Sequence, residues 1–277
     1  MLKQRIITAL VLVCVMGSAI VFLSPLYFAA LMTAVILAAS WEWSALAGLA
    51  GSLNRAIYSA CSLLLMALVA WYCQLLSEQL AWPRVRDVLG LGCLWWAVAL
   101  LWVKSYPYSG KLWGAVPARL LMGFLVLIPA WLAFISLRFN AHGTAYIFVL
   151  LALVASADTG AYFSGKAWGK SKLAVAVSPG KSWAGFWGGL VATSSLALLL
   201  WLYYGSAAMR LEQVLVVAVL TGLASVLGDL LESMVKRHQG VKDSGTLLPG
   251  HGGIMDRLDS LTAAAPVFAL CIILVGW

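Results

Sequence analysis

Nine stretches of this sequence lack Asp, Glu, Lys and Arg and approach the length of a membrane-spanning helix. They are Ile6–Ser24, Pro25–Trp41, Ala56–Ser77, Val88–Val103, Leu120–Leu137, Thr144–Ala157, Trp183–Tyr204, Gln213–Gly228 and Ser260–Trp277. A helix needs about 20 mostly apolar residues to cross the hydrocarbon core. The runs are continuous rather than alternating, which argues against a membrane β-barrel. The pattern predicts an all-α integral membrane protein with about nine transmembrane helices.

The composition excludes the main classes of soluble protein. Of the 277 residues, 63% are hydrophobic and 10% are charged, whereas a soluble domain is about half apolar and about a quarter charged. The mean hydropathy is +0.96. So few polar side chains cannot cover the surface of a water-soluble core. A soluble enzyme, a secreted disulfide scaffold and a disordered chain are therefore excluded.

The basic residues predict the orientation of these helices. If the N-terminus is cytoplasmic, nine spans leave only Arg84, Arg86, Arg138 and Arg210 outside, so 14 of the 18 Lys and Arg residues are cytoplasmic. Cytoplasmic loops of membrane proteins carry such an excess. We therefore expect a cytoplasmic N-terminus and an outside C-terminus. Because the net charge of +8 is explained by these loops, we expect no nucleic-acid partner.

The acidic residues are scarce and concentrated near the C-terminus. Five of the ten are Asp229, Glu232, Asp243, Asp256 and Asp259. A carboxylate at membrane depth is costly and marks a candidate functional site, and the i,i+3 spacing of Asp256 and Asp259 places both on one helix face. All-oxygen ligands suit Mg²⁺, which also binds substrate phosphates. We predict a Mg²⁺ site at Asp229, Asp256 and Asp259.

The same segment contains residues suited to phosphate binding. Its basic residues are Lys236, Arg237, Lys242 and Arg257, and its glycines include Gly252 and Gly253, which directly follow His251. Basic side chains neutralise phosphate charge, and glycine permits close approach of the backbone. Two roles stay open for His251: it could orient a phosphate or a metal-bound water, or it could form hydrogen bonds with the backbone. Taken alone, Lys236 or Arg237 would be explained equally well as a basic residue that only helps to set the membrane topology.

A second polar segment, residues 158–182, is rich in lysine and glycine. It contains Asp158, Lys166, Lys170 and Lys181. A P-loop is excluded, because the position that requires its first glycine holds Ser164. The segment suits a polyphosphate, although its lysines also fit topology charges. Near the N-terminus, we interpret Trp41-Glu42-Trp43 as an interfacial anchor and not as part of a site.

A longer motif joins these features and resembles a known signature. It runs Ser233-Met234-Val235-Lys236-Arg237, four residues, Lys242-Asp243-Ser244-Gly245, then Leu248-Pro249-Gly250-His251-Gly252-Gly253-Ile254-Met255-Asp256-Arg257-Leu258-Asp259. This pattern resembles phosphatidate cytidylyltransferases of the bacterial type, also called CDP-diacylglycerol synthases. The resemblance extends to residues 228–233, 178–182, 158–162 and 41–43.

The resemblance implies an enzyme of the bacterial inner membrane that joins CTP to phosphatidate, giving CDP-diacylglycerol and pyrophosphate. It implies dependence on Mg²⁺ held by Asp229, Asp256 and Asp259, and a homodimer; a second, monovalent cation stays open. One departure is Ala184, where relatives often have Glu or Gln. The contact that such a side chain makes in relatives would be absent here.

These observations divide the chain and assign roles to its residues. We expect an N-terminal part of about five spans (residues 1–143) and a catalytic part (144–277) with cytoplasmic loops 158–182 and 229–259. The expected catalytic residues are Asp229, Asp256, Asp259, Lys242 and Arg257. The expected substrate-binding residues are Asp158, Lys166, Lys170, Ser178, Lys181, Ser182, Ser233, Lys236, Arg237, Asp243, His251, Gly252 and Gly253.

Two other functions stay open at this point. A CTP-using lipid kinase would direct attack to the γ-phosphorus and release CDP. An ion-coupled transporter would use its carboxylates for protons or cations, but its carboxylates would then be expected near the midplane of several spans. In this chain the polar residues gather at one face instead.

Overall fold

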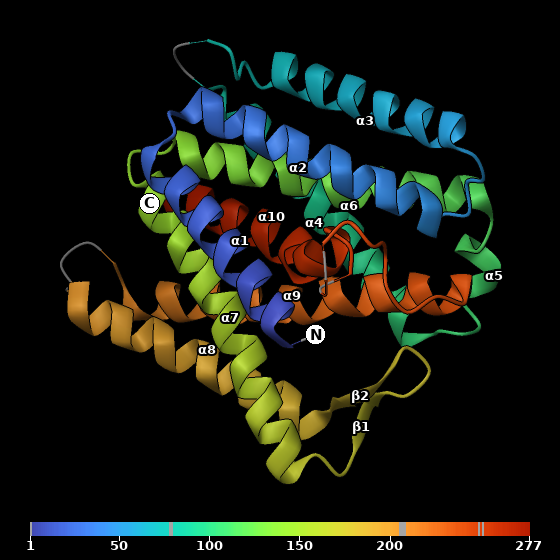
Figure 1. Cartoon of the computed structure of the whole chain (residues 1–277). Helices are drawn as coiled ribbons and strands as arrows, with labels where there is room; N and C mark the ends of the chain where they lie inside the picture. The colour runs from blue at the N-terminus through green and yellow to red at the C-terminus, as the bar shows by residue number, and fades with distance from the viewer. Residues whose placement is uncertain (1, 78–79, 205–208, 249, 251) are drawn as a thin grey trace.

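Helices form nearly all of the chain in the computed structural model, which describes residues 2–77, 80–204, 209–248, 250 and 252–277 (Figure 1). The helices are α1 (Leu2–Phe22), α2 (Pro25–Leu46), α3 (Ser52–Tyr72), α4 (Trp82–Lys104), α5 (Gly110–Trp113), α6 (Val116–Phe139), α7 (Gly143–Trp168), α8 (Trp183–Tyr204), α9 (Leu211–Gln239) and α10 (Met255–Val275). The prediction of an all-α membrane protein is confirmed.

Eight of the nine expected spans correspond to helices that are long and apolar enough to cross a membrane. These are α2, α3, α4 and α6 to α10. The remaining expected span, Ile6–Ser24, falls mostly on α1, which has 21 residues, and its crossing of the membrane stays a prediction. The orientation of the termini stays a prediction.

The two expected cytoplasmic loops begin later than predicted. Helix α7 continues through Asp158 to Trp168, and α9 continues through Asp229 to Gln239. Expecting a loop from residue 158 and from residue 229 was therefore wrong. A charged side chain does not end a helix; α9 ends instead at Gly240, whose φ of +76° is the left-handed conformation typical of a helix C-cap. Asp158 and Asp229 are thus held on rigid elements.

A short β-hairpin, absent from the prediction, connects α7 with α8. Strand β1 (Lys172–Ala174) pairs antiparallel with β2 (Ser178–Ser182), with Lys172 opposite Ser182 and Ala174 opposite Ser178. Figure 1 shows the hairpin at the end of α7, where it directs the chain back into α8. The hairpin places Lys181 beside the helices and not at the tip of a loop.

Helix α6 forms the centre of the bundle. In its most apolar stretch 78% of the residues are buried, against 17% in α3, which lies at the outer edge beside α2 (Figure 1). Helices α2, α4 and α10 pack around α6, and Trp43 and Phe268 are among the large side chains buried completely. Packing against α6 therefore brings α2, near the N-terminus, next to α10 at the other end of the sequence.

Candidate active site

A cavity of about 430 Å³ lies where α7, the hairpin, α8 and α9 meet. Its polar lining includes Asp158 and Lys166 from α7, Lys181 and Ser182 from β2, and Asp229 from α9. The rest of the lining is mostly apolar, with Tyr162, Phe186 and Val226. We call this cavity the Lys181 pocket. It brings together residues from the two polar segments that the sequence predicted to act together.

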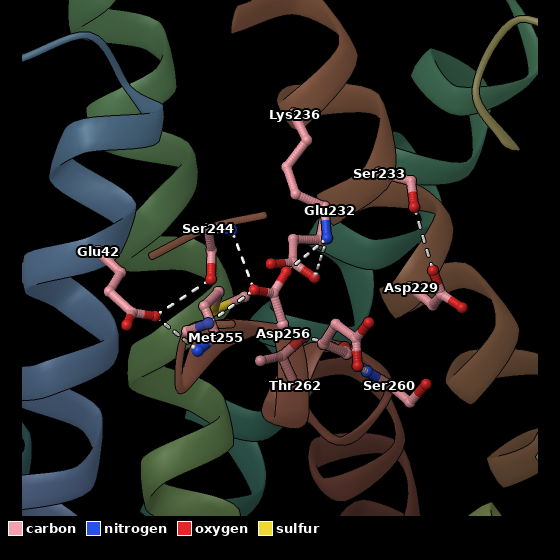
Figure 2. Close-up of polar contacts among 12 residues, drawn as sticks. Glu42, Asp229, Glu232, Ser233, Lys236, Ser244, Met255, Asp256, Ser260 and Thr262 are labelled. Carbon is pink, nitrogen blue, oxygen red and sulfur yellow. Dashed lines mark hydrogen bonds and ion pairs between the residues drawn. The ribbon is translucent and has the colours of Figure 1, made fainter. Parts of the chain in front are cut away.

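The Lys181 pocket contains a close ion pair. Lys181 Nζ lies 2.6 Å from Asp229 Oδ2, and the two side chains are 26% and 30% exposed. Ser233, one turn further along α9, donates a hydrogen bond from its hydroxyl to Asp229 Oδ1 at 3.1 Å (Figure 2). Ser233, predicted to bind substrate, thus orients the Asp229 carboxylate. Both oxygens of Asp229 are held in place while the side chain remains accessible.

Small residues allow the helices around the pocket to approach closely. A Cβ at Gly160 would lie 2.5 Å from Ala192 Cβ, and one at Gly189 would lie 2.8 Å from the carbonyl oxygen of Ala157. Such small residues let the backbones of transmembrane helices pack together. Ser182, predicted to bind substrate, caps α8 by accepting a hydrogen bond from the Gly185 amide at 3.1 Å.

Helices α9 and α10 meet beside the pocket. A Cβ at Gly228 would overlap the carbonyl oxygen of Asp259 and would lie 3.2 Å from Ala263 Cβ. Only a glycine therefore lets the backbone of α9 pack on α10 at this level. Because Asp229 follows Gly228 in the sequence, this contact brings Asp229 to the level of Asp259, as the predicted metal site requires.

Lys236 lies in a second ion network, deeper than the first. Its Nζ donates to Asp256 Oδ1 at 2.8 Å and lies 3.2 Å from Glu232 Oε2 (Figure 2). The three side chains are at most 12% exposed. Lys236 therefore compensates two buried carboxylates, a role that differs from the predicted contact with substrate.

Asp256 also accepts hydrogen bonds from the loop that precedes α10. Its Oδ2 accepts from the amides of Ser244 at 3.0 Å and Gly253 at 2.8 Å. A Cβ at Gly252 would lie 2.6 Å from the same oxygen, and Gly252 has a φ of +81°. Gly252, predicted to bind substrate, thus leaves room for Asp256. The predicted part of Asp256 in metal binding and catalysis stays a prediction.

The donor set permits a test of the predicted metal site. Among the described residues no three His, Cys, Asp or Glu side chains lie close enough together to hold a metal ion, so the three aspartates do not form a ready-made ligand set. Mg²⁺ is commonly held by one or two carboxylates together with substrate phosphates. Asp229 and Asp259, brought together where α9 crosses α10, fit that smaller requirement.

The other predicted site residues are distributed around the pocket. Lys170 and Ser178 lie on the hairpin side but do not line it. Arg237 donates from Nε to the carbonyl oxygen of Val177 at 3.3 Å, so it joins α9 to the hairpin. Lys242, Asp243 and Arg257 are exposed near the start of α10, and His251 lies outside the described residues. Ala184 lies in the first turn of α8.

Glu42 is a site residue that the sequence interpretation missed. It is 4% exposed and lies on α2, from which its side chain points toward Ser244 and Met255 (Figure 2). Trp43 is buried completely and donates to the carbonyl oxygen of Arg119 at 2.8 Å. Interpreting Glu42 and Trp43 as an interfacial anchor was wrong, because both side chains face the interior. A carboxylate between two tryptophans was the available signal.

Comparisons with known proteins identify the family of this chain. The model of a family described as the cytidylyltransferase family matches residues 3–275. A phosphatidate cytidylyltransferase from Pseudomonas aeruginosa is 45% identical over 277 residues, covering 100% of this chain and 99% of the relative. One from Haemophilus influenzae is 40% identical, covering 97% and 98%. One from Bacillus subtilis is 40% identical over 151 residues, covering 52% and 56%. This chain therefore belongs to the cytidylyltransferase family.

Proposed function

We propose that this protein transfers the cytidylyl group of CTP to phosphatidate, giving CDP-diacylglycerol and pyrophosphate. The observation that carries the proposal is the Lys181 pocket, where an accessible carboxylate, Asp229, is held 2.6 Å from an accessible lysine among small and apolar side chains. Full-length relatives named phosphatidate cytidylyltransferase support the same reaction.

The reaction needs charge neutralisation more than a strong base. The phosphomonoester of phosphatidate is already largely dianionic at neutral pH and can attack the α-phosphorus of CTP directly, releasing pyrophosphate. Repulsion between the two anions is the main barrier, so positioning and positive charge supply the catalysis. Lys166 and Lys181 bring positive charge to the pocket, and Lys242 and Arg257 near the start of α10 would add to it.

We also propose that Mg²⁺ is held by Asp229 and Asp259, with Asp256 nearby. When bound, Mg²⁺ would neutralise phosphate charge and stabilise the leaving pyrophosphate. Lys181 is the cation that contacts Asp229 in this structure. Asp229 and Asp259 would hold the metal, and Lys181 would contact a phosphate of CTP.

The lining of the pocket suits a meeting of lipid and nucleotide. Tyr162 and Phe186 line it, and the nearby Trp183 and Trp187 are exposed, as aromatic residues at a membrane interface are. We propose that the protein acts in the bacterial inner membrane with this pocket on the cytoplasmic side, as the asymmetry of basic residues indicates. The resemblance also supports a homodimer, and the position of the basic residues in membrane-proximal loops argues against a nucleic-acid partner.

A product assay tests this function. Purified protein in detergent receives phosphatidate, Mg²⁺ and CTP labelled in the cytosine ring, and both lipid and aqueous products are analysed. We expect label in a liponucleotide together with an equal amount of pyrophosphate. CDP accompanied by a phosphorylated lipid would indicate a lipid kinase instead. No turnover with phosphatidate or any other lipid acceptor would contradict the proposal.

A further inference from the structure

Glu42 on α2 makes three hydrogen bonds to the segment that leads into α10. Its Oε1 accepts from the Ile254 amide at 3.0 Å, and its Oε2 accepts from the Met255 amide at 2.8 Å and from the Ser244 hydroxyl at 3.1 Å. The bond to Ile254 joins residues 212 positions apart. Figure 2 shows the carboxylate reaching from α2 toward Ser244 and Met255. These contacts exist only because the tertiary fold places α2 against α10.

The start of α10 requires such a partner from elsewhere in the chain. The first amides of a helix have no partner within the helix and carry partial positive charge. The residue before α10 is Ile254, whose side chain cannot accept a hydrogen bond, and no side-chain cap is present. Glu42 supplies the missing acceptors, and its negative charge matches the positive end of the helix.

Two glycines of the signature leave room for Glu42. A Cβ at Gly245 would lie 2.6 Å from Glu42 Oε1, and a Cβ at Gly253 would overlap Glu42 Oε2. Gly253 was predicted to bind substrate, but in the structure it accommodates the carboxylate. Glycine is therefore required at both positions by the space that Glu42 occupies.

Glu42 and Asp256 both accept hydrogen bonds from Ser244 and from the residues that lead into α10. Ser244 donates its amide to Asp256 and its hydroxyl to Glu42, and the consecutive amides of Gly253 and Ile254 go to Asp256 and Glu42 respectively. We call these contacts the α10 clamp: Glu42, Ser244, Gly253, Ile254, Met255 and Asp256. The clamp holds the start of α10, one turn before Asp259.

We propose that Glu42 is a positioning residue that sets the placement of Asp256 and Asp259 relative to Asp229 through the α10 clamp. This inference rests on the proposed function, because it concerns the geometry of that reaction. Without the Glu42 carboxylate, the amides of Ile254 and Met255 and the hydroxyl of Ser244 lose their acceptors, so the start of α10 must rearrange. A shift of about 1 Å at a catalytic group can reduce turnover about 100-fold.

The test compares Glu42→Gln and Ser244→Ala with wild type and with Ser40→Ala. Ser40 is the matched control, because it is a buried polar residue on the same helix whose hydroxyl pairs with Ser62 on α3 and not with α10. We expect kcat to fall about 100-fold in Glu42→Gln and about tenfold in Ser244→Ala, with little change in the KM of either substrate. Ser40→Ala should keep the wild-type kcat.

The double variant Glu42→Gln with Ser244→Ala distinguishes a shared clamp from two separate effects. Ser244→Ala should cause almost no further loss of kcat once Glu42 is replaced, because the effects of substitutions within one hydrogen-bond network do not add. Glu42→Asp, which keeps the charge on a shorter side chain, should recover part of kcat. Wild-type kcat in folded Glu42→Gln, or fully additive losses in the double variant, would overturn the inference.

Two further measurements distinguish a failure of this inference from a folding defect and from a failure of the proposed function. If Glu42→Gln does not fold, Gly253→Ala tests the same clamp by displacing the carboxylate, with Gly90→Ala as control because a Cβ there meets open space. Normal kcat in folded Gly253→Ala would overturn the inference. Absence of liponucleotide synthesis in the wild type would instead contradict the proposed function. Loss of synthesis only in the variants would leave the proposed function intact.

Discussion

Two lysine–aspartate pairs of the same family signature differ in their surroundings. Lys181 and Asp229 are about a quarter to a third exposed and line a cavity. Lys236 and Asp256 are 12% and 8% exposed, and Glu232 and two backbone amides complete their network. From the sequence alone, both lysines are candidate phosphate ligands and both aspartates are candidate metal ligands. The structure gives the first pair room for a substrate and the second a fixed set of protein partners.

Within one signature, the accessible pair is therefore suited to binding a ligand, and the buried pair is suited to stabilising the fold. A buried charge must be compensated by its neighbours, and removing one partner leaves the other uncompensated. An accessible pair can exchange its partner for a metal ion or a phosphate at much lower cost, because solvent already screens it. Substitutions at the two pairs should therefore change different measurable quantities: turnover or KM at the accessible pair, and stability at the buried pair.

Asp229→Asn should reduce turnover at least about 1000-fold, because it removes a charge that acts directly in the site. The folded protein should persist, since the side chain is accessible and Asn can still accept the hydrogen bond of Ser233. The measurement is liponucleotide formation at saturating CTP and phosphatidate. The matched control is Asp87→Asn, whose pair with Arg86 is more than half exposed and should not affect turnover. Substantial activity in Asp229→Asn would place the chemistry elsewhere.

Lys236→Met should lower the free energy of unfolding by about 3 kcal/mol, because Glu232 and Asp256 would then be buried without a cation. Thermal unfolding in detergent measures this loss. Lys104→Met serves as the control, since Lys104 is exposed at the end of α4 and its replacement should change stability little. Normal stability together with a raised KM for CTP would mean that Lys236 binds substrate, as its position in the signature first suggested.

Lys181→Ala should raise the KM for CTP about tenfold, as expected for loss of one charge-assisted contact. Its kcat should change less, because Asp229 and the other basic residues remain. Lys170→Ala is a suitable comparison, since Lys170 lies near the same hairpin without lining the pocket. A KM for CTP in Lys181→Ala that equals the wild-type value would mean that Lys181 only helps to set the membrane topology.

Ser182→Ala should destabilise the protein by about 1 kcal/mol through loss of the α8 cap. The KM for CTP should stay near that of wild type, because the hydroxyl accepts a bond from the Gly185 amide. Ser171→Ala, at an exposed position before β1, should be neutral in thermal unfolding. A raised KM with unchanged stability would restore the predicted contact of Ser182 with substrate.

The membrane class and most of the helices could be predicted from local sequence. Long uncharged runs admit few other folds, because a backbone in lipid must satisfy its own hydrogen bonds. The helix ends were harder to predict. Asp158 and Asp229 suggested loops, but a charged residue continues a helix when it faces a cavity or a partner. The hairpin was missed because its two strands are short and contain no alternating apolar pattern.

Among the site residues, the two polar segments and their motif predicted the participants but not their roles. Asp229 and Lys181 were both candidates, and their 2.6 Å contact joins α9 to the hairpin. Lys236, Gly252 and Gly253 were assigned to substrate, whereas in the structure they compensate or accommodate carboxylates. Glu42 was assigned to the interface, since no local pattern indicates a partner 212 residues away.

The sequence by itself determined that this chain crosses membranes as helices and that its acidic, basic and glycine residues gather in two polar segments. Those properties depend on hydrophobicity and spacing, which are local. Only the tertiary structure decided which charges are compensated by the protein and which are left accessible. That depends on helix packing, because burial and hydrogen-bond partners arise when α2, α7, α8, α9 and α10 come together.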